Sequence, residues 1–185
     1  MADTREKILV TMARLIEKQG FHATGLNEII RESGAPKGSV YYYFPGGKEQ
    51  IGAEAILEAG TIISGRLHAL LEAEADPVSA ISSFMLNMAE SMEAAGYNSG
   101  SPLTTATIET TITSEAINKA CRKAFDMILS AFREKFIESG IKQAKASELA
   151  MFVTTLIEGG ILMSRTYHDA KPLRIAARQL KGLLA

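Results

Sequence analysis

The sequence of 185 residues contains one cysteine, Cys121, and no tryptophan. A single cysteine cannot form an internal disulfide, and a chain of this length with 46% hydrophobic residues can bury a core without disulfide or metal staples. The N-terminal segment has no basic stretch followed by an apolar run of the kind found in signal peptides. We therefore expect a globular protein of the reducing cytoplasm.

Long apolar runs and a strong net charge are also missing. Glu, Lys or Ser interrupts the apolar stretches every few residues, whereas a membrane-spanning helix needs about 20 apolar residues. We therefore expect no association with a membrane. Because the formal net charge is only −1, any surface that binds nucleic acid has to be a local patch.

The motifs of several enzyme classes are absent. His22, His68 and His168 lie far apart in the chain, so no pair has the spacing of a zinc hydrolase. The sequence has no G-x-x-x-x-G-K phosphate loop, and the serine of segment 96–100 is misplaced for a nucleophile elbow. We expect a protein that is not an enzyme and uses neither a metal nor a cofactor.

Helix-forming residues dominate the composition that is present. Ala, Leu, Ile, Met, Glu and Lys prevail, prolines number five, and no segment alternates with the period of a strand. The sequence predicts an all-α fold in which a three-helix unit over residues 1–47 precedes a six-helix unit over residues 48–185. Pro45-Gly46-Gly47 marks the expected boundary.

Caps, glycines and prolines indicate where the helices begin and end. Before the boundary, the expected helices run from Asp3 or Thr4 to Gly20, from an N-cap at Thr24 to Gly34, and from Lys37 to Phe44. After it, they run from Lys48 to about Leu71, Pro77 to Ala94, Leu103 to Thr113, Ser114 to Ser139, Ser147 to His168, and Pro172 to near Leu184. Two short helices joined by a tight glycine turn, as at Gly34, are typical of a helix-turn-helix.

The third expected helix lies in the segment GAPKGSVYYYF, which carries three consecutive tyrosines at positions 41–43. Val40 and Phe44 are four residues apart and can share one buried face with Ile8, Leu15 and Ile29. At least two of the tyrosines must then face outward. Exposed tyrosines therefore require an explanation other than core packing.

A duplex provides one explanation. A tyrosine hydroxyl beside Lys37 can donate to a phosphate oxygen while its ring packs against a sugar or a thymine methyl. The small Gly38 and Ser39 let the helix N-terminus approach base edges and phosphates. The alternative is a helical protein–protein adaptor without DNA binding, in which the tyrosines anchor an interface.

Residues of about 4–51, with FHATGLNEIIRESGAPKGSVYYYFPGGKEQI at their centre, resemble the DNA-binding domain of the TetR family of bacterial transcriptional regulators. The matching positions are Phe21, Thr24, Gly34, Lys37, Gly38, Ser39, Val40, Tyr41, Tyr42, Phe44, Lys48 and Glu49. The sequence departs from the pattern at Tyr43, where histidine is usual, at Pro36, and in a longer link to Lys48. The last two departures, together with segment 100–103, resemble the branch that includes repressors of lincomycin-type multidrug efflux genes.

The resemblance implies a homodimeric repressor that binds a palindromic DNA operator and is released by a small hydrophobic effector. It implies that the DNA contacts are made by Thr24, Lys37, Gly38, Ser39, Tyr41, Tyr42 and Lys48. Reasoning from the residues supports Lys37 and the tyrosines but does not separate base contacts from phosphate contacts.

Methionines and phenylalanines of the later helices are suited to an adaptable apolar pocket, which the family places among these helices. The candidate pocket residues are Phe84, Met85, Met88, Met92, Phe125, Met127, Phe132, Met151 and Phe152. Asn87, Tyr97 and Glu109 are candidate polar anchors. Each methionine can equally be an ordinary core residue.

The last two expected helices carry apolar stripes, and the family uses these helices as a four-helix dimer interface. The candidate interface residues are Ile157, Gly160, Ile161, Leu173, Ala177, Leu180 and Leu184. Because periodicity does not say what covers a stripe, these residues can instead close the core of the monomer.

Overall fold

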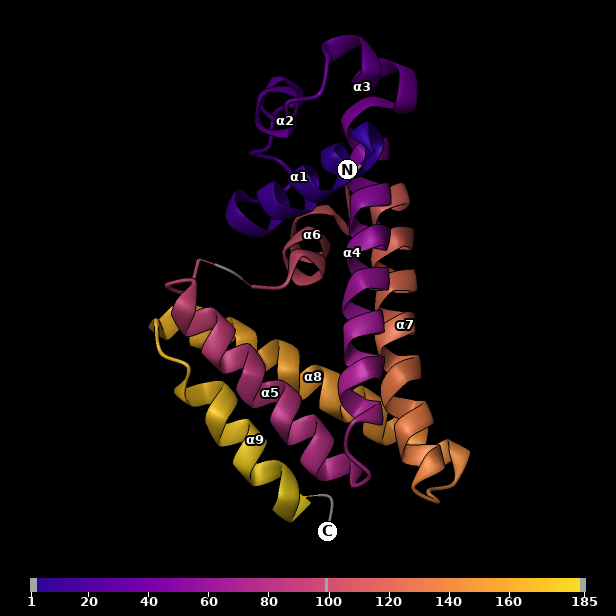
Figure 1. Cartoon of the computed structure of the whole chain (residues 1–185), viewed down its shortest axis with the longest axis vertical. Coiled ribbons are helices and arrows are strands. Elements are labelled where there is room, and N and C mark those ends of the chain that lie inside the picture. Colours follow the sequence, from indigo (N-terminus) through magenta and orange to yellow (C-terminus); the bar gives the residue numbers. More distant parts are fainter. Residues whose placement is uncertain (1–2, 99, 184–185) are drawn as a thin grey trace. The chain divides into compact units, whose positions relative to one another are not determined.

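The computed structural model describes residues 3–98 and 100–183, which form nine helices and contain no strand (Figure 1). The helices are α1 (Thr4–Gln19), α2 (Leu26–Ser33), α3 (Lys37–Tyr43), α4 (Gly47–Glu72), α5 (Pro77–Ala94), α6 (Pro102–Thr110), α7 (Glu115–Glu138), α8 (Gln143–Tyr167) and α9 (Lys171–Leu183). The predicted all-α fold, with three short helices followed by six others, is confirmed.

The chain forms two compact units. One takes in the chain up to Ile62 and Ser101–Phe125, and the other takes in Ile63–Gly100 and the chain from Asp126 onward. Both α4 and α7 therefore contribute to each unit. This division does not coincide with the domain boundary expected at Pro45-Gly46-Gly47, which stays a prediction.

In the first unit, α1 contacts α2, α3 and α6. The predicted shared core is confirmed, because the residues expected to face it are buried: Ile8, Leu15, Ile29, Val40 and Phe44. The turn between α2 and α3 begins at Gly34, whose left-handed φ of 65° is unfavourable for residues that carry a Cβ. Pro36 then stands at the N-cap of α3.

Some helix ends differ from the prediction. The Asp3 side chain makes no capping hydrogen bond at α1. Helix α8 begins at Gln143, four residues before the expected start, and the Ser147 hydroxyl donates to the Gln143 carbonyl inside the helix. The threonine-rich segment is helical as predicted, but α6 ends at Thr110, and Ser101 caps its start.

In the second unit, α9 lies beside α5 and α8 (Figure 1). The Arg174 guanidinium donates to both carboxylate oxygens of Glu93, which holds the pKa of Glu93 below its usual range. Gly160 brings α8 close to α9, because a Cβ at this position would lie 2.7 Å from Cδ2 of Leu173. These contacts fix α9 against its two neighbours.

Among the described residues, α8 alone is long and apolar enough to cross a membrane by length and composition. The expectation that every apolar stretch is too short does not hold for this helix, because isolated charged residues leave it apolar on average. Of its most apolar window, 39% is buried within the protein. A core helix of a soluble protein meets the same criterion, so α8 is weak evidence for a membrane span.

Candidate nucleic-acid interface

The surface of α3 is set by two side chains on its inner face. Val40 and Phe44 are buried one helical turn apart, which fixes the rotation of the helix about its axis. Tyr41 and Tyr42 consequently face outward, with 51% and 80% of their surface exposed. Tyr43 is half-buried and packs edge-on against Tyr42, with the ring centroids 5.2 Å apart. The prediction that at least two tyrosines face outward is confirmed.

Lys37 provides the cation of this surface. It is exposed in the first turn of α3, and no ion pair of Lys37 is found among residues 3–98 and 100–183. Gly38 beside it is exposed and Ser39 is half-exposed, so the helix start is accessible. An unpaired ammonium beside two exposed phenol rings is chemically suited to bind phosphate and base edges.

Arginines on the neighbouring helices are already paired. Nη2 of Arg14 on α1 lies 2.9 Å from Glu32 on α2, and Arg31 lies 3.3 Å from the same carboxylate. The bond from Arg14, followed by that from Arg31, holds the pKa of Glu32 below its usual range. The ion pair of Arg14 connects α1 to α2, and both pairs leave Lys37 as the more available cation.

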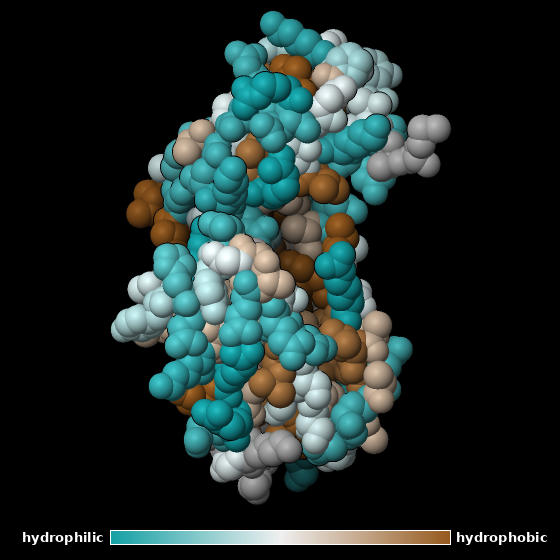
Figure 2. All heavy atoms as spheres, turned by 60° about the vertical axis from the view of Figure 1, so that its left-hand side comes forward, coloured by the Kyte–Doolittle hydropathy of each residue, from teal (hydrophilic) through white to brown (hydrophobic). Residues whose placement is uncertain are grey.

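Hydrophilic side chains cover much of the face shown in the space-filling view, with apolar residues exposed between them (Figure 2). On α3 the exposed side chains are Lys37, Tyr41 and Tyr42, each of which carries a polar group. Such a surface is more typical of a nucleic-acid interface than of the apolar centre of a protein interface.

Thr24 is placed differently from the sequence prediction. The N-cap of α2 is Gly25, and Thr24 is fully buried before it. Its hydroxyl donates to the Gly20 carbonyl at 2.7 Å and its backbone N–H to the Phe21 carbonyl at 3.2 Å. Because both donors are used inside the protein, the structure does not support Thr24 as a phosphate contact. It stabilises the turn between α1 and α2 instead.

Lys48 lies at the start of α4 and is also engaged inside the first unit. Its Nζ donates to the His22 carbonyl at 3.3 Å and lies 4.4 Å from the centroid of the Phe21 ring. Burial lowers the pKa of Lys48, and the negative charge of Glu109 partly offsets this effect. In the DNA-free protein, this ammonium is therefore directed toward the α1–α2 turn.

Glu109 on α6 lies elsewhere than predicted. It was expected near the pocket, but its Oε2 accepts from the His22 backbone N–H at 3.0 Å. The carboxylate lies directly over Gly20, where a Cβ would come within 1.8 Å of Oε1. No local pattern connects positions so far apart in the chain, although the helix-ending glycine was visible in the sequence.

Replacing Gly20 with alanine is expected to destabilise the protein by about 2 kcal/mol or more. The new Cβ would occupy a backbone with φ of 90°, which disfavours residues other than glycine, and would displace the Glu109 carboxylate. Denaturant unfolding measures the effect. Gly65→Ala is the matched control, since its Cβ meets nothing within 4 Å inside α4 and should stabilise the protein by about 0.5–1 kcal/mol. Equal changes at the two glycines would contradict this explanation.

The predicted pocket residues do not all gather in one place. Phe84 on α5 contacts Phe132 on α7 edge-on at 6.3 Å, and Met85 and Met92 are buried. Met88 and Met127 are half-buried in the same unit. Phe125 belongs to the other compact unit.

Two of the predicted pocket residues need correction. Met151 and Phe152 on α8 are 55% and 41% exposed, because they lie on the face of the helix opposite its buried stripe. Of the candidate polar anchors, Asn87 is exposed, and Tyr97 packs its ring against His168. Neither position therefore identifies a polar residue that would anchor a ligand.

The predicted dimer residues are also placed differently. They are buried within the single chain, as the alternative interpretation of the stripe required: Ile157, Gly160, Ile161, Leu173, Ala177 and Leu180. Leu184 lies outside the described residues. This stripe closes the core of the second unit, so the outer face of α8 and α9 is lined, apart from Gly160, by other residues.

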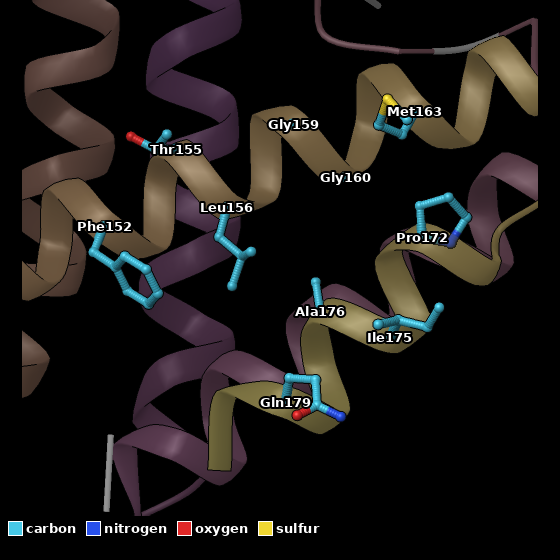
Figure 3. A pocket seen from close by; sticks show the side chains of 10 residues that line it. All are labelled: Phe152, Thr155, Leu156, Gly159, Gly160, Met163, Pro172, Ile175, Ala176 and Gln179. Carbon is cyan, nitrogen blue, oxygen red and sulfur yellow. The ribbon is translucent and has the colours of Figure 1, made fainter. Parts of the chain in front are cut away.

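That outer face forms an open apolar groove of about 530 Å³ between α8 and α9 (Figure 3). Its lining residues are Phe152, Thr155, Leu156, Gly159, Gly160, Met163, Pro172, Ile175, Ala176 and Gln179. Leu156 and Ala176 point toward one another across it (Figure 3). The groove residues repeat with helical spacing, but the sequence gives two such stripes on α8 and does not say which one is buried.

Comparison with known proteins defines the family. Residues 8–55 match the family model described as bacterial regulatory proteins, tetR family, and residues 77–179 match that of the C-terminal domain of LmrA/YxaF-like transcriptional regulators. The chain belongs to the TetR family. The predicted branch, that of LmrA-like regulators, is confirmed by the second match.

Relatives and solved structures agree with this TetR-family membership. The chain is 39% identical over 182 residues to the uncharacterized HTH-type transcriptional regulator YxaF of Bacillus subtilis, covering 98% of this chain and 95% of that protein. It is 40% identical over 171 residues to LmrA of the same organism, covering 92% and 91%. The crystal structure of reduced Escherichia coli NemR has the same fold, with a TM-score of 0.85 at 23% identity over 97% of this chain and 96% of that one. This TetR-family chain is therefore a transcriptional regulator with an N-terminal helix-turn-helix.

Proposed function

We propose that this regulator is a dimeric repressor that binds a palindromic operator through α3 and is released by a small apolar effector. The observation that carries the proposal is the outer surface of α3, where exposed Lys37 stands beside exposed Tyr41 and Tyr42. Gly38 and Ser39 let this surface approach the major groove. Lys48 is a further phosphate contact once it leaves the α1–α2 turn.

Dimerisation is proposed to use the outer groove between α8 and α9. An exposed apolar groove lined by Phe152, Met163 and Ile175 is unfavourable in water, and a second copy of the chain can cover it. Two copies related by a twofold axis would present two α3 helices to two half-sites of a palindrome. One helix alone contacts too few base pairs to be selective.

The effector is proposed to bind among apolar side chains of the second unit. Phe84, Met85 and Phe132 provide aromatic and thioether surface there, which adapts to apolar ligands of different shape. A ligand that binds better to a conformation with incorrectly spaced α3 helices weakens operator binding by the same factor as the operator weakens ligand binding.

Selection of duplexes from a randomised library by the full-length protein tests the proposed DNA binding. We expect enrichment of a palindromic sequence. If each subunit neutralises about three phosphates, log K should fall against log salt with a slope of about −5. Failure to enrich any duplex, or a slope near zero, would favour the protein–protein adaptor instead.

A further inference from the structure

A carboxylate and an ammonium meet at one short turn of the first unit. Glu109 reaches it from α6 and Lys48 reaches it from the start of α4. Glu109 accepts from the N–H of His22, and Lys48 donates to the carbonyl of the same residue. Both peptide groups of His22 are thus held by side chains from other helices.

Several contacts hold Glu109 at this turn. Its carboxylate covers Gly20, and its own backbone carbonyl lies 3.2 Å from a ring nitrogen of His22. Together with the hydrogen bond from the His22 N–H at 3.0 Å, these contacts fix the end of α6 against the segment between α1 and α2. The carboxylate therefore has a defined position near Lys48 rather than a freely moving one.

Lys48 is held by contacts that a DNA phosphate would have to replace. Its ammonium lies over the Phe21 ring and against the His22 carbonyl, within the field of the Glu109 charge. A phosphate that approached this ammonium would also approach the carboxylate, which repels it. The carboxylate and the phosphate thus compete for one cation.

Resting on the proposed DNA binding, we propose that Glu109 is a positioning residue that holds Lys48 at the α1–α2 turn in the DNA-free protein and so reduces operator affinity. Lys48 binds a phosphate only when it exchanges its partners at the turn for the phosphate.

Glu109→Gln tests the proposal in the full-length protein. The amide oxygen still accepts from the His22 N–H, but the negative charge is removed. We expect binding to a duplex selected by the wild-type protein to become about two- to fivefold tighter per subunit, as for the loss of one exposed charge pair. The salt slope should change little, because Lys48 reaches the phosphate in both proteins and only the cost of leaving the turn differs.

Glu115→Gln on α7 is the matched control. It removes the same charge from the same unit, but Glu115 pairs with Lys119 and not with Lys48. It should change affinity by less than Glu109→Gln does. In a Lys48→Met background, the gain from Glu109→Gln should disappear, since a general structural effect of Glu109 would persist there.

Two results would overturn the proposal while leaving DNA binding intact. One is an equal affinity gain in Glu109→Gln and Glu115→Gln, and the other is a gain from Glu109→Gln that survives in the Lys48→Met background. By contrast, a wild-type protein that binds no duplex at all would refute the proposed function itself. Binding of the wild-type protein to the selected duplex thus distinguishes a failure of the Glu109 proposal from a failure of the proposed function.

Discussion

Lys37→Ala is expected to weaken binding to the selected duplex by about 30-fold or more. A good contact to a base edge contributes about 1–3 kcal/mol, and a dimer would lose two such contacts. The fold should survive, because Lys37 is exposed on α3 and the buried face of that helix is unchanged. Fluorescence anisotropy with a labelled duplex measures the loss.

The salt dependence of the same variant assigns the role of Lys37. If the ammonium binds phosphate, the magnitude of the slope should fall by about 1 per subunit and all sequences should bind more weakly. If it reads a base, the slope should stay and selectivity at one position should relax. Lys145→Ala removes an equal charge from the other unit and is the control. Equal losses in the two variants would contradict a specific role for Lys37.

Phe152→Glu in the outer groove should dissociate the proposed dimer. Phe152 contributes apolar surface to the groove, and a carboxylate there would be buried without a partner by a second copy. We expect dimer affinity to fall by about 100-fold, corresponding to about 3 kcal/mol. Sedimentation analysis measures it, and operator affinity should fall in parallel because one half-site is then bound alone.

Ile112→Glu is the matched control for the groove variant. Ile112 is 98% exposed in the first unit, so the substitution changes the charge and removes a surface isoleucine without touching the groove. This variant should keep the wild-type oligomeric state. A Phe152→Glu protein that is as dimeric as wild type would place the dimer interface elsewhere.

Much of the local structure followed from short-range patterns. Ser114 was expected to cap α7, and its Oγ accepts from the Ile117 N–H at 3.2 Å. The spacing of Val40 and Phe44 predicted which face of α3 is buried and hence that Tyr42 is exposed. These features depend on residues within about one helical turn, which is the range that a sequence displays directly.

Contacts between remote segments were not predictable in the same way. The sequence predicted that Glu109 lies near a ligand, but in the structure its carboxylate binds the His22 N–H. Thr24 was predicted to contact DNA, but the fold buries it. The residues around Glu109 do not indicate a contact with His22, and those around His22 do not indicate one with Glu109, because the contact depends on how α6 packs against α1. Such packing is a property of the assembled helices.

The sequence by itself determined the helical content, the helix-turn-helix and the side of α3 that carries Lys37 and Tyr42. Only the tertiary structure decided which apolar stripe of α8 is internal, with Ile157 buried and Met151 exposed. Both stripes have the spacing of a helix, so the periodicity of the sequence does not indicate which of them is buried. The packing of the helices in the second unit covers the stripe with Ile157 and leaves Met151 open, and this depends on their assembly rather than on the periodicity of α8.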